Sequence, residues 1–367
     1  MFDNTHTRLS LQLFADSGTM VNTTGGTANA YTGETTTSAN WAPGLKTFYE
    51  TQLLENARHD MIFTQFADHV ALPAHHGNTI EFRKFNTFAH AGQLQEGVVP
   101  SAQPFGETKI EAYISQWGTY TAISDILDTR NYDPVIIGAT EEMAASMAET
   151  QEVLLRDSLL SNPNVLYADN VDKATGKATG TTPLSCEEME CSDTVIAMIT
   201  PATLALAATI MKKNRVPQIR RGGKGGGKYA IILHPSVTHD LRMHPDWMEV
   251  HKYSATEEIF SGEVGQLHGF YIIESLLAPV LDGDEYANKA GTVTYASFAF
   301  GKDAFATIDP GEGNARLIIK DRKEIGGPLE QWSTVGYKFE TGSIVKYPER
   351  LLRIMSCTSF SGVDEAN

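Results

Sequence analysis

Alternating apolar and polar residues predict two strands separated by a long polar stretch. Thr79–Phe85 alternates as a half-buried strand does, and its expected partner runs from Lys109 to Trp117 and continues over Thr119–Ser124. Residues 86–108 between them contain three glycines, two prolines and only scattered apolar side chains. A loop of this length is uncommon inside a compact domain and is usually functional or disordered. Because two good strands hold its ends together, we predict an extended hairpin arm that finds its contacts on a neighbouring copy of the chain.

A long helix is expected over residues 133–161. Asp133 can cap its start, and Pro134 suits the first helical position because that N–H would be unpaired in any case. The expected apolar stripe is Ile136, Met143, Met147 and Leu154. The charged residues expected mostly on other faces are Glu141, Glu142, Glu149, Glu152 and Arg156. The pattern fits an ordinary amphipathic core helix, and beside the predicted arm it also fits a spine that carries the arm.

Shorter patterns predict the rest of the fold. Residues 16–40 are rich in small polar residues and predict a flexible arm, and residues 44–58 have the spacing of an amphipathic helix. Ser192–Lys213 predicts a helix interrupted near Thr200, and the apolar run Tyr229–Leu233 predicts a buried strand. Further strands are expected at Gly269–Glu274, Val293–Phe300, Arg316–Lys320, Val335–Ile344 and Leu351–Cys357. Because helices and strands neither alternate strictly nor segregate, the order favours an α+β fold.

Charge and cysteine content narrow the function classes. The 367-residue chain carries a formal charge of −16, which argues against a general nucleic-acid binder, because such a protein needs a basic face for phosphates. Three cysteines without dense spacing indicate a reducing compartment and no disulfide framework. No apolar run approaches the eighteen or so residues of a membrane span, and the first residues are too polar for a signal peptide. We therefore expect synthesis in the cytoplasm and no membrane partner.

A glycine-rich basic run occupies residues 220–228. Gly222–Lys228 has the spacing of a phosphate-binding loop, but Tyr229 follows where a serine or threonine would bind magnesium. The run also enters a predicted strand instead of a helix, so no helix N-terminus would face a phosphate. The loop is either solvated without a fixed partner, or it meets an acidic patch on another copy or packaged nucleic acid. The basic residues in question are Arg220, Arg221, Lys224 and Lys228.

Two further groups of residues have side chains of the types found in metal or catalytic sites. His234, His239, His244 and His251 do not share one helical face and lack the H-E-x-x-H order of zinc hydrolases. We interpret them as surface and capping histidines. Cys186 and Cys191 supply at most two thiolates, without further ligands at zinc-finger spacing. The sequence therefore predicts no catalytic residue, no cofactor and no metal.

Several motifs resemble one family in the order in which that family has them. They are Thr79–Arg83, Glu96–Gly97, Ile123–Leu127, His234–Arg242, Pro245–Trp247, Tyr253, Gly262–Gly269, Gly301–Ala304 and Pro328–Lys338. Together they look like the tailed-bacteriophage major capsid protein family typified by the coliphage N-four protein, over about residues 41–357. The long Thr/Gly-rich N-terminal arm and the basic loop depart from that family's pattern.

The resemblance implies the Hong Kong 97-type capsid fold, an α+β fold with an N-terminal arm, an extended hairpin called the E-loop, and a spine helix. It divides the chain into the flexible arm 1–43, a lead-in helix region 44–77 and the E-loop 78–120. A peripheral domain follows at 121–199 with the spine helix at 133–161, then an axial domain at 200–310. Residues 311–367 return to the peripheral domain and form the tail.

The implied function is a virion shell of hexamers and pentamers around double-stranded DNA, without sequence-specific DNA binding. The implied partners are the chain itself, portal and scaffolding proteins, and decoration proteins. The E-loop residues expected to contact a neighbouring subunit are Phe88, Gln93, Leu94, Glu96, Val98 and Phe105. Two alternatives are an encapsulin-like nanocompartment, and an enzyme that uses the His234–His251 cluster or the Gly222–Lys228 loop.

Overall fold

The computed structural model describes residues 21–22, 61–73, 77–86, 88–93, 99, 101–130, 135–173, 175–180, 182–220, 227–244, 247, 263–283, 286–310, 315–325 and 329–367. The chain forms two compact units. The first contains Thr119–Met143 and Leu317–Tyr337 together with residues 21–22. The second contains Leu54–Gly118, Ala144–Arg316 and Lys338–Asn367. Each unit is described on its own. Among the described residues, no helix has the length and apolar character needed to cross a membrane.

The first unit is built from strands with a small apolar core. Its elements are β1 (Val21–Asn22), β5 (Ser115–Ser124), α2 (Asp125–Arg130), α3 (Val135–Leu160), β15 (Arg316–Lys320), α7 (Arg322–Ile325) and β16 (Trp332–Val345), of which β5, α3, β15 and β16 continue into the second unit. Strand β16 pairs with β5 and β15, and β1 runs parallel to β5. Ile123, Leu127 and Val335 form the core, against which Ile136 and Met143 of α3 pack. This half of the predicted apolar stripe is confirmed.

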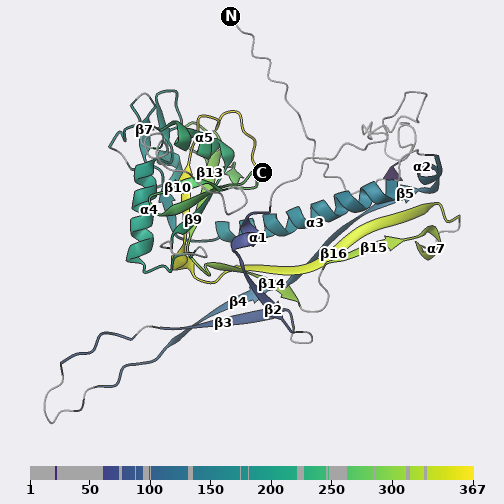
Figure 1. Cartoon of the computed structure of the whole chain (residues 1–367), viewed down its shortest axis with the longest axis horizontal. Coiled ribbons are helices and arrows are strands. Elements are labelled where there is room, and N and C mark those ends of the chain that lie inside the picture. Colours follow the sequence, from purple (N-terminus) through teal and green to yellow (C-terminus); the bar gives the residue numbers. More distant parts are fainter. Residues whose placement is uncertain are drawn as a thin grey trace, which may run out of the picture. The chain divides into compact units, whose positions relative to one another are not determined.

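The second unit is centred on a mixed seven-stranded sheet with the order β10-β11-β9-β13-β17-β6, with β12 paired to β13 (Figure 1). Its strands are β6 (Val165–Tyr167), β9 (Tyr229–Leu233), β10 (Glu263–Leu267), β11 (Phe270–Glu274), β12 (Val280–Leu281), β13 (Thr294–Phe300) and β17 (Leu351–Ser356). The remaining helices are α1 (Phe63–Phe66), η1 (Cys186–Glu188), α4 (Pro201–Lys213), α5 (Pro235–Met243) and η2 (Pro348–Arg350). The other strands are β2 (Asp68–Leu72), β3 (Thr79–Phe85), β4 (Glu107–Tyr113), β7 (Asn170–Asp172), β8 (Val195–Ala197) and β14 (Phe305–Pro310).

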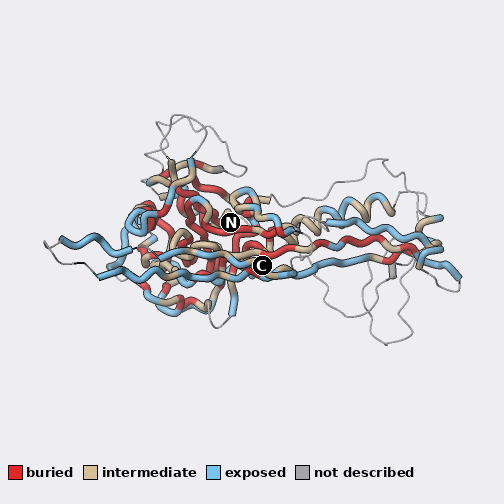
Figure 2. Tube along the Cα trace, turned by 90° about the horizontal axis from the view of Figure 1, so that it is seen from below, coloured by how far each residue is buried: buried red, intermediate tan, exposed pale blue. Residues whose placement is uncertain are grey.

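The two faces of this sheet bury alternate residues of the same strand. On β9, Tyr229, Ile231 and Leu233 join the cluster that also contains the apolar faces of α4 and α5. Ala230 and Ile232 point into the opposite cluster, with Phe63 of α1 and the C-terminal half of α3. All five residues of β9 are buried, which explains why its sequence is a continuous apolar run. Figure 2 shows buried chain gathered where this sheet lies and exposed chain along the hairpin β3–β4.

Several predicted elements have the expected limits. β3, β9 and β15 span the predicted residues, and β11, β13, β16 and β17 differ from prediction by at most a few residues at their ends. The long helix is confirmed as Val135–Leu160. Its proposed cap, residues 133–134, the predicted helix at 44–58 and the arm at 1–43 lie outside the described residues, apart from β1.

Two predictions were wrong. Ser192–Ile199 is not helical, because β8 pairs there with β7, and only Pro201–Lys213 forms the helix. The strand expected to continue from Lys109 through Trp117 is broken at Ile114, so that β4 pairs with β3 and β5 belongs to another sheet. Glu152 and Arg156, which lie off the predicted apolar stripe, are buried, and hydrogen bonds with other parts of the unit satisfy their charges.

Candidate functional site

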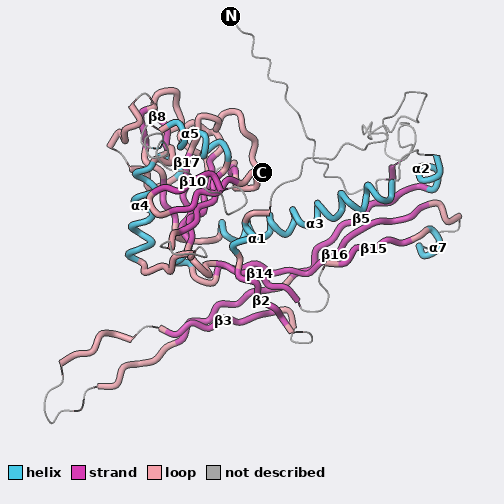
Figure 3. The backbone as a smooth tube through the Cα atoms, viewed as in Figure 1, coloured by secondary structure: helices cyan, strands magenta, loops and turns pink. Residues whose placement is uncertain are grey.

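The hairpin β3–β4 forms a regular antiparallel ladder. Its seven residue pairs run from Thr79 opposite Tyr113 to Phe85 opposite Glu107. Beyond the last pair the two legs stay together, because the Asn86 N–H donates to the Gly106 carbonyl at 2.9 Å and the Gln103 side chain donates to the Ala89 carbonyl at 3.3 Å. Figure 3 shows the two strands continuing as loops beyond the ladder. The predicted extended arm is therefore present.

The base of the arm is anchored within its own unit. Leu72 of β2, Ala112 of β4 and Ile308 of β14 form a small buried cluster, against which Ile80 and Phe82 of β3 pack. Two lysines add polar contacts. Lys84 pairs with Glu349, and Lys346 pairs with Asp68 while its ammonium lies 5.4 Å from the centre of the Phe82 ring. The arm therefore starts from a fixed position, because its first strand is held by apolar and ionic contacts together.

Beyond that base the arm exposes aromatic side chains. Phe85, Phe88 and Phe105 are 60, 56 and 61% exposed. Their rings stack, with centroids 4.8 Å apart for Phe85 and Phe105 and 5.4 Å apart for Phe88 and Phe105. A contiguous exposed apolar group on a soluble protein usually marks an interaction site. We call these three rings the aromatic stack.

A group of charged residues lies on the part of the ladder nearer to the Thr79–Tyr113 pair. Lys109 lies between Glu81 and Glu111, with N–O distances of 2.5 and 2.6 Å, and Tyr113 donates to Glu111 at 3.0 Å. The hydrogen bond with Glu111 is the main cause that raises the pKa of Lys109, and the same bond lowers the pKa of Glu111. Because these groups are exposed, their contribution to stability is small. They keep this part of the arm polar, whereas the aromatic stack supplies a group of exposed apolar rings further along it.

Two of the six predicted contact residues lie in this stack. Phe88 and Phe105 belong to it, and Gln93 is exposed further along the arm. Leu94, Glu96 and Val98 lie outside the described residues. Sequence reasoning missed Phe85. As the last residue of the predicted strand it carried a usable signal, because its even spacing from Arg83 and Glu81 places it on the exposed face of β3.

The basic loop is closed at its base. Ile219 and Lys228 form an isolated antiparallel bridge, with backbone hydrogen bonds of 2.8 and 3.0 Å, immediately before β9. The run therefore enters a strand, as predicted. Lys228 bonds to the Gln266 side chain and lies 5.5 Å from the centre of the Tyr271 ring, whereas Arg220 is exposed. Arg221 and Lys224 lie outside the described residues.

The predicted histidine group does not converge on one point. His234 caps α5 by accepting the Ser236 N–H, and burial lowers its pKa. His239 lies beside Asp240, with 3.3 Å between its Nδ1 and the carboxylate. His244 Nε2 contacts the Gly176 carbonyl at 3.3 Å, and His251 lies outside the described residues. The capping interpretation is confirmed for His234.

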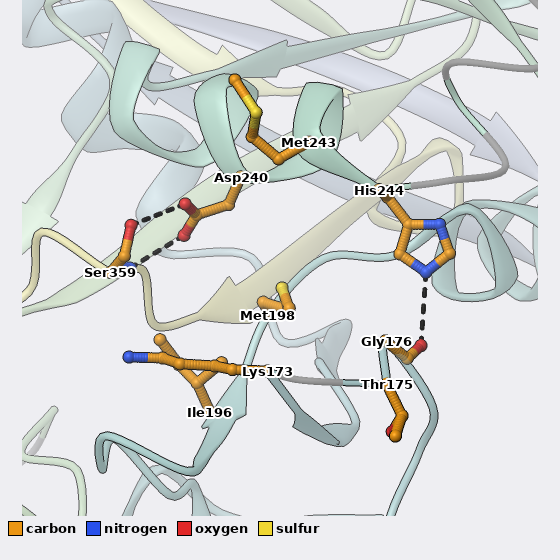
Figure 4. Close-up of a pocket in the computed structure, with 9 residues that line it drawn as sticks. All are labelled: Lys173, Thr175, Gly176, Ile196, Met198, Asp240, Met243, His244 and Ser359. Atoms are coloured by element: carbon orange, nitrogen blue, oxygen red, sulfur yellow. Dashed lines mark hydrogen bonds between the residues drawn. The ribbon is translucent and has the colours of Figure 1, made fainter.

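A hollow of about 340 Å³ lies beside this helix (Figure 4). Two of its polar side chains are occupied within the chain: Asp240 accepts the hydroxyl and the N–H of Ser359 at 2.6 and 2.8 Å, and His244 contacts the Gly176 carbonyl. The remaining lining includes Met198 and Met243. Within the described part of the chain, no three His, Cys, Asp or Glu residues are grouped as metal ligands would be.

Comparison with known proteins agrees with the fold. The family model described as "Phage capsid protein" matches residues 107–339. The capsid structure of cyanophage P-SCSP1u is similar with a TM-score of 0.60 and 16% identity, over 86% of this chain and 94% of that one. The capsid of Ralstonia phage GP4 gives a TM-score of 0.60 and 13% identity, over 89% and 98%. The cyanophage Pam1 capsid gives a TM-score of 0.63 and 10% identity, over 89% and 100%. No curated protein matches the chain.

The fold is that of a capsid subunit of the Hong Kong 97-type, which is an α+β fold. Its features here are a long helix, an anchored hairpin arm with exposed aromatic rings, and a mixed sheet. The chain belongs to the phage capsid protein family. It is a structural protein of a phage shell, in which many copies associate.

Proposed function

We propose that the chain is the major capsid protein of a tailed phage and that its hairpin arm is the principal link between neighbouring subunits. The observation that carries this role is the aromatic stack on an arm whose base is fixed. Copies would associate as hexamers and pentamers and close an icosahedral shell around double-stranded DNA. The role is mechanical and requires no catalysis.

The aromatic stack supplies the free energy of each link. Burying one exposed phenylalanine against a neighbour contributes about 1.5–3 kcal/mol, and Phe85, Phe88 and Phe105 are all more than half exposed. Ordering a mobile arm costs entropy, but the anchored base of β3 limits that cost. Each copy both donates an arm and accepts one, so many modest contacts sum over a closed shell. Gln93, Leu94, Glu96 and Val98 would surround this contact and fix its position.

Removing the stack tests the proposal. The double variant Phe88→Ser, Phe105→Ser should keep the thermal stability of the isolated subunit, because both rings are exposed. Its assembly should fall by at least tenfold, since losing the burial of two rings removes about 3 kcal/mol or more from each contact. Sedimentation velocity and electron microscopy of the purified full chain measure the fraction in shells.

A matched control separates the arm from exposed apolar residues in general. Leu276→Ser removes an apolar side chain that is 58% exposed in the turn after β11. This control should assemble like the unmodified chain. Normal shells from the double phenylalanine variant would refute the role of the arm.

The basic loop is a second proposed contact surface. Arg220, Arg221, Lys224 and Lys228 lie on a chain of charge −16, so they would attract either an acidic patch of another copy or packaged DNA. Exchanging the first three for serine should weaken shells more at low salt than at high salt, because screening already removes the attraction at high salt. If the variant shells are weaker than unmodified shells by the same amount at low and at high salt, this contact is contradicted.

The remaining assignments follow from the capsid role. The N-terminal arm 1–43, the E-loop 78–120, the peripheral domain 121–199 and the axial domain 200–310 are proposed as the functional divisions, with residues 44–77 and 311–367 completing the peripheral part. Portal, scaffolding and decoration proteins are proposed partners, and synthesis in the host cytoplasm would precede assembly. The acidic balance suits an inner wall that does not retain DNA.

A further inference from the structure

Two cysteines that are distant in the sequence meet beside strand β8. Cys191 forms an antiparallel bridge with Ile196, and the Cys357 N–H donates to the neighbouring Ala197 carbonyl at 2.6 Å. Both side chains pack in the same apolar cluster, and each thiol is the main influence on the pKa of the other. Cys357 is fully buried after β17, whereas Cys191 is partly accessible. The two cysteines are therefore neighbours in one cluster, and one of them is open to solvent.

The surroundings distinguish the two sulfurs. The Cys357 thiol is the main influence that favours the thiolate of Cys191, and the hydroxyls of Thr292 and Ser361 and the positive charge of Lys173 act in the same direction. These contacts outweigh burial and lower the pKa of Cys191 to about 6. At pH 7 a thiol of that pKa is roughly nine-tenths thiolate, compared with a few per cent for an ordinary cysteine. The bond with Cys191 and burial raise the pKa of Cys357, whose sulfur also accepts from the Asn288 amide at 3.3 Å.

We propose that Cys191 and Cys357 are a reversible redox pair, which closes to a disulfide by exchange with a small-molecule disulfide such as oxidised glutathione. The Cys191 thiolate attacks one sulfur of the glutathione disulfide, and the S–S bond breaks to release one glutathione thiolate. Cys357 then gives its proton to that thiolate and attacks the Cys191 sulfur, which expels the second glutathione. Two protein thiols are oxidised by two electrons, and one glutathione disulfide is reduced to two thiols.

Closing this pair joins the end of β17 to the segment that precedes β8. Such a link encloses a large loop, and it would restrict opening of this part of the sheet. The cytoplasm keeps thiols reduced, while the medium outside a cell is oxidising. If the proposed capsid function holds, the subunit would assemble in the reduced form and gain the link after release. The pairing itself requires no assembly and can be tested on unassembled chains.

The test uses the purified full chain, incubated with oxidised glutathione at pH 7. The number of free thiols, titrated after denaturation, should fall from three to one. Peptide mapping should join the fragment with Cys191 to the fragment with Cys357. Cys191→Ser should retain its two remaining thiols, whereas the matched control Cys186→Ser should lose both of its remaining thiols. Dithiothreitol should restore every thiol.

Two further measurements keep the inference open to refutation. The rate of Cys191 alkylation by iodoacetamide should reach half its maximum near pH 6, and the oxidised chain should melt several degrees above the reduced one. Three free thiols after incubation of the unmodified chain, or a link that contains Cys186, would overturn the pairing. Mapping of the unmodified chain decides this even if Cys357→Ser fails to fold.

Discussion

The carboxylate of Glu152 accepts the backbone N–H of Thr64 at 3.0 Å, so that the long helix α3 holds the start of the short helix α1. The same carboxylate also accepts the Phe63 N–H and the Thr64 hydroxyl. Glu152 is 0% exposed, and Phe63 is buried in the adjacent core. The first N–H groups of a helix have no partner within it, and a buried carboxylate without partners is costly. Each group therefore satisfies the other.

Replacing this carboxylate should loosen the start of the ordered chain. Glu152→Ala leaves two backbone N–H groups near α1 without an acceptor, and we expect a loss of about 3 kcal/mol in unfolding free energy. Thermal denaturation would measure the loss. Hydrogen exchange should show faster amide exchange over residues 61–66 than in the unmodified chain, with less change in β9.

The matched control lies on the same helix. Glu142→Ala removes an exposed glutamate from α3, and its melting temperature should stay within about 1 °C of the unmodified value. If both variants melt at the same temperature, or if exchange over residues 61–66 is unchanged in Glu152→Ala, the link between α3 and α1 does not contribute as described.

Sequence patterns predicted elements whose burial is strictly periodic or complete. β3 alternates between half-buried and exposed residues, and β9 is buried on both faces, so each leaves an unambiguous pattern. The long helix was recognisable because neither glycine nor proline occurs between Ala139 and Leu160. The hairpin arm followed from two such strands and a long polar stretch between them. The sequence predicts Phe88 and Phe105 as contacts of the arm, whereas the stacking of their rings is seen only in the structure.

Contacts between distant segments left no local pattern. The region Ser192–Ile199 has residues compatible with a helix, yet pairing of β8 with β7 decides its conformation. Nothing in the sequence indicates the partner of Glu152, which is the backbone of α1, far away in the chain. The approach of Cys191 to Cys357 likewise depends on the order of strands in the sheet. Such features require the three-dimensional structure.

A second prediction concerns the base of the hairpin arm. A Cβ atom on Gly342 of β16 would lie 2.6 Å from the Tyr113 carbonyl oxygen at the end of β4, which is too close for any real contact. Gly342→Ala should therefore displace backbone and lower the unfolding free energy by about 1–3 kcal/mol. Denaturant titration of the unassembled chain would measure it, and subsequent assembly should also weaken as the arm loses its fixed direction.

The control for this substitution is on the arm itself. Gly92 has no heavy atom within 4 Å of an added Cβ, so Gly92→Ala should leave the unfolding free energy unchanged within about 0.5 kcal/mol. A Gly342→Ala chain as stable as Gly92→Ala would show that β16 and β4 are not packed as closely as described.

The third prediction is a stabilising substitution in the long helix. Gly138 lies within α3, and an added Cβ would meet nothing within 4 Å. Gly138→Ala should raise the unfolding free energy by about 0.5–1 kcal/mol, because alanine loses less conformational freedom in a helix. Gly77→Ala is the contrasting variant, since Gly77 also has open space but a φ of +83° that disfavours any other residue. A lower melting temperature for Gly138→Ala than for the unmodified chain would contradict a regular helix at this position.

The fourth prediction is a pH dependence that originates at the start of α5. His234 accepts the Ser236 N–H through Nδ1 at 3.3 Å, and its ring packs on Tyr295 with centroids 5.3 Å apart. Burial lowers the pKa of His234, although the nearby Asp364 acts in the opposite direction. The unfolded chain therefore binds a proton at His234 more readily than the folded chain does. Its contribution to stability is complete above the ordinary histidine pKa of about 6.5 and is lost as pH falls below that value.

His234→Asn removes this titration but keeps a side chain that can cap the helix. When the pH falls from 7.5 to 5.5, the melting temperature of the unmodified chain should decrease more than that of His234→Asn. The difference between the two chains should begin near pH 6.5. The matched control His239→Asn removes a half-exposed imidazole from the same helix, and it should follow the unmodified profile. If His234→Asn instead follows the unmodified profile between these two pH values, the buried ring of His234 does not couple protonation to folding, and the acid sensitivity of the subunit must come from its carboxylates.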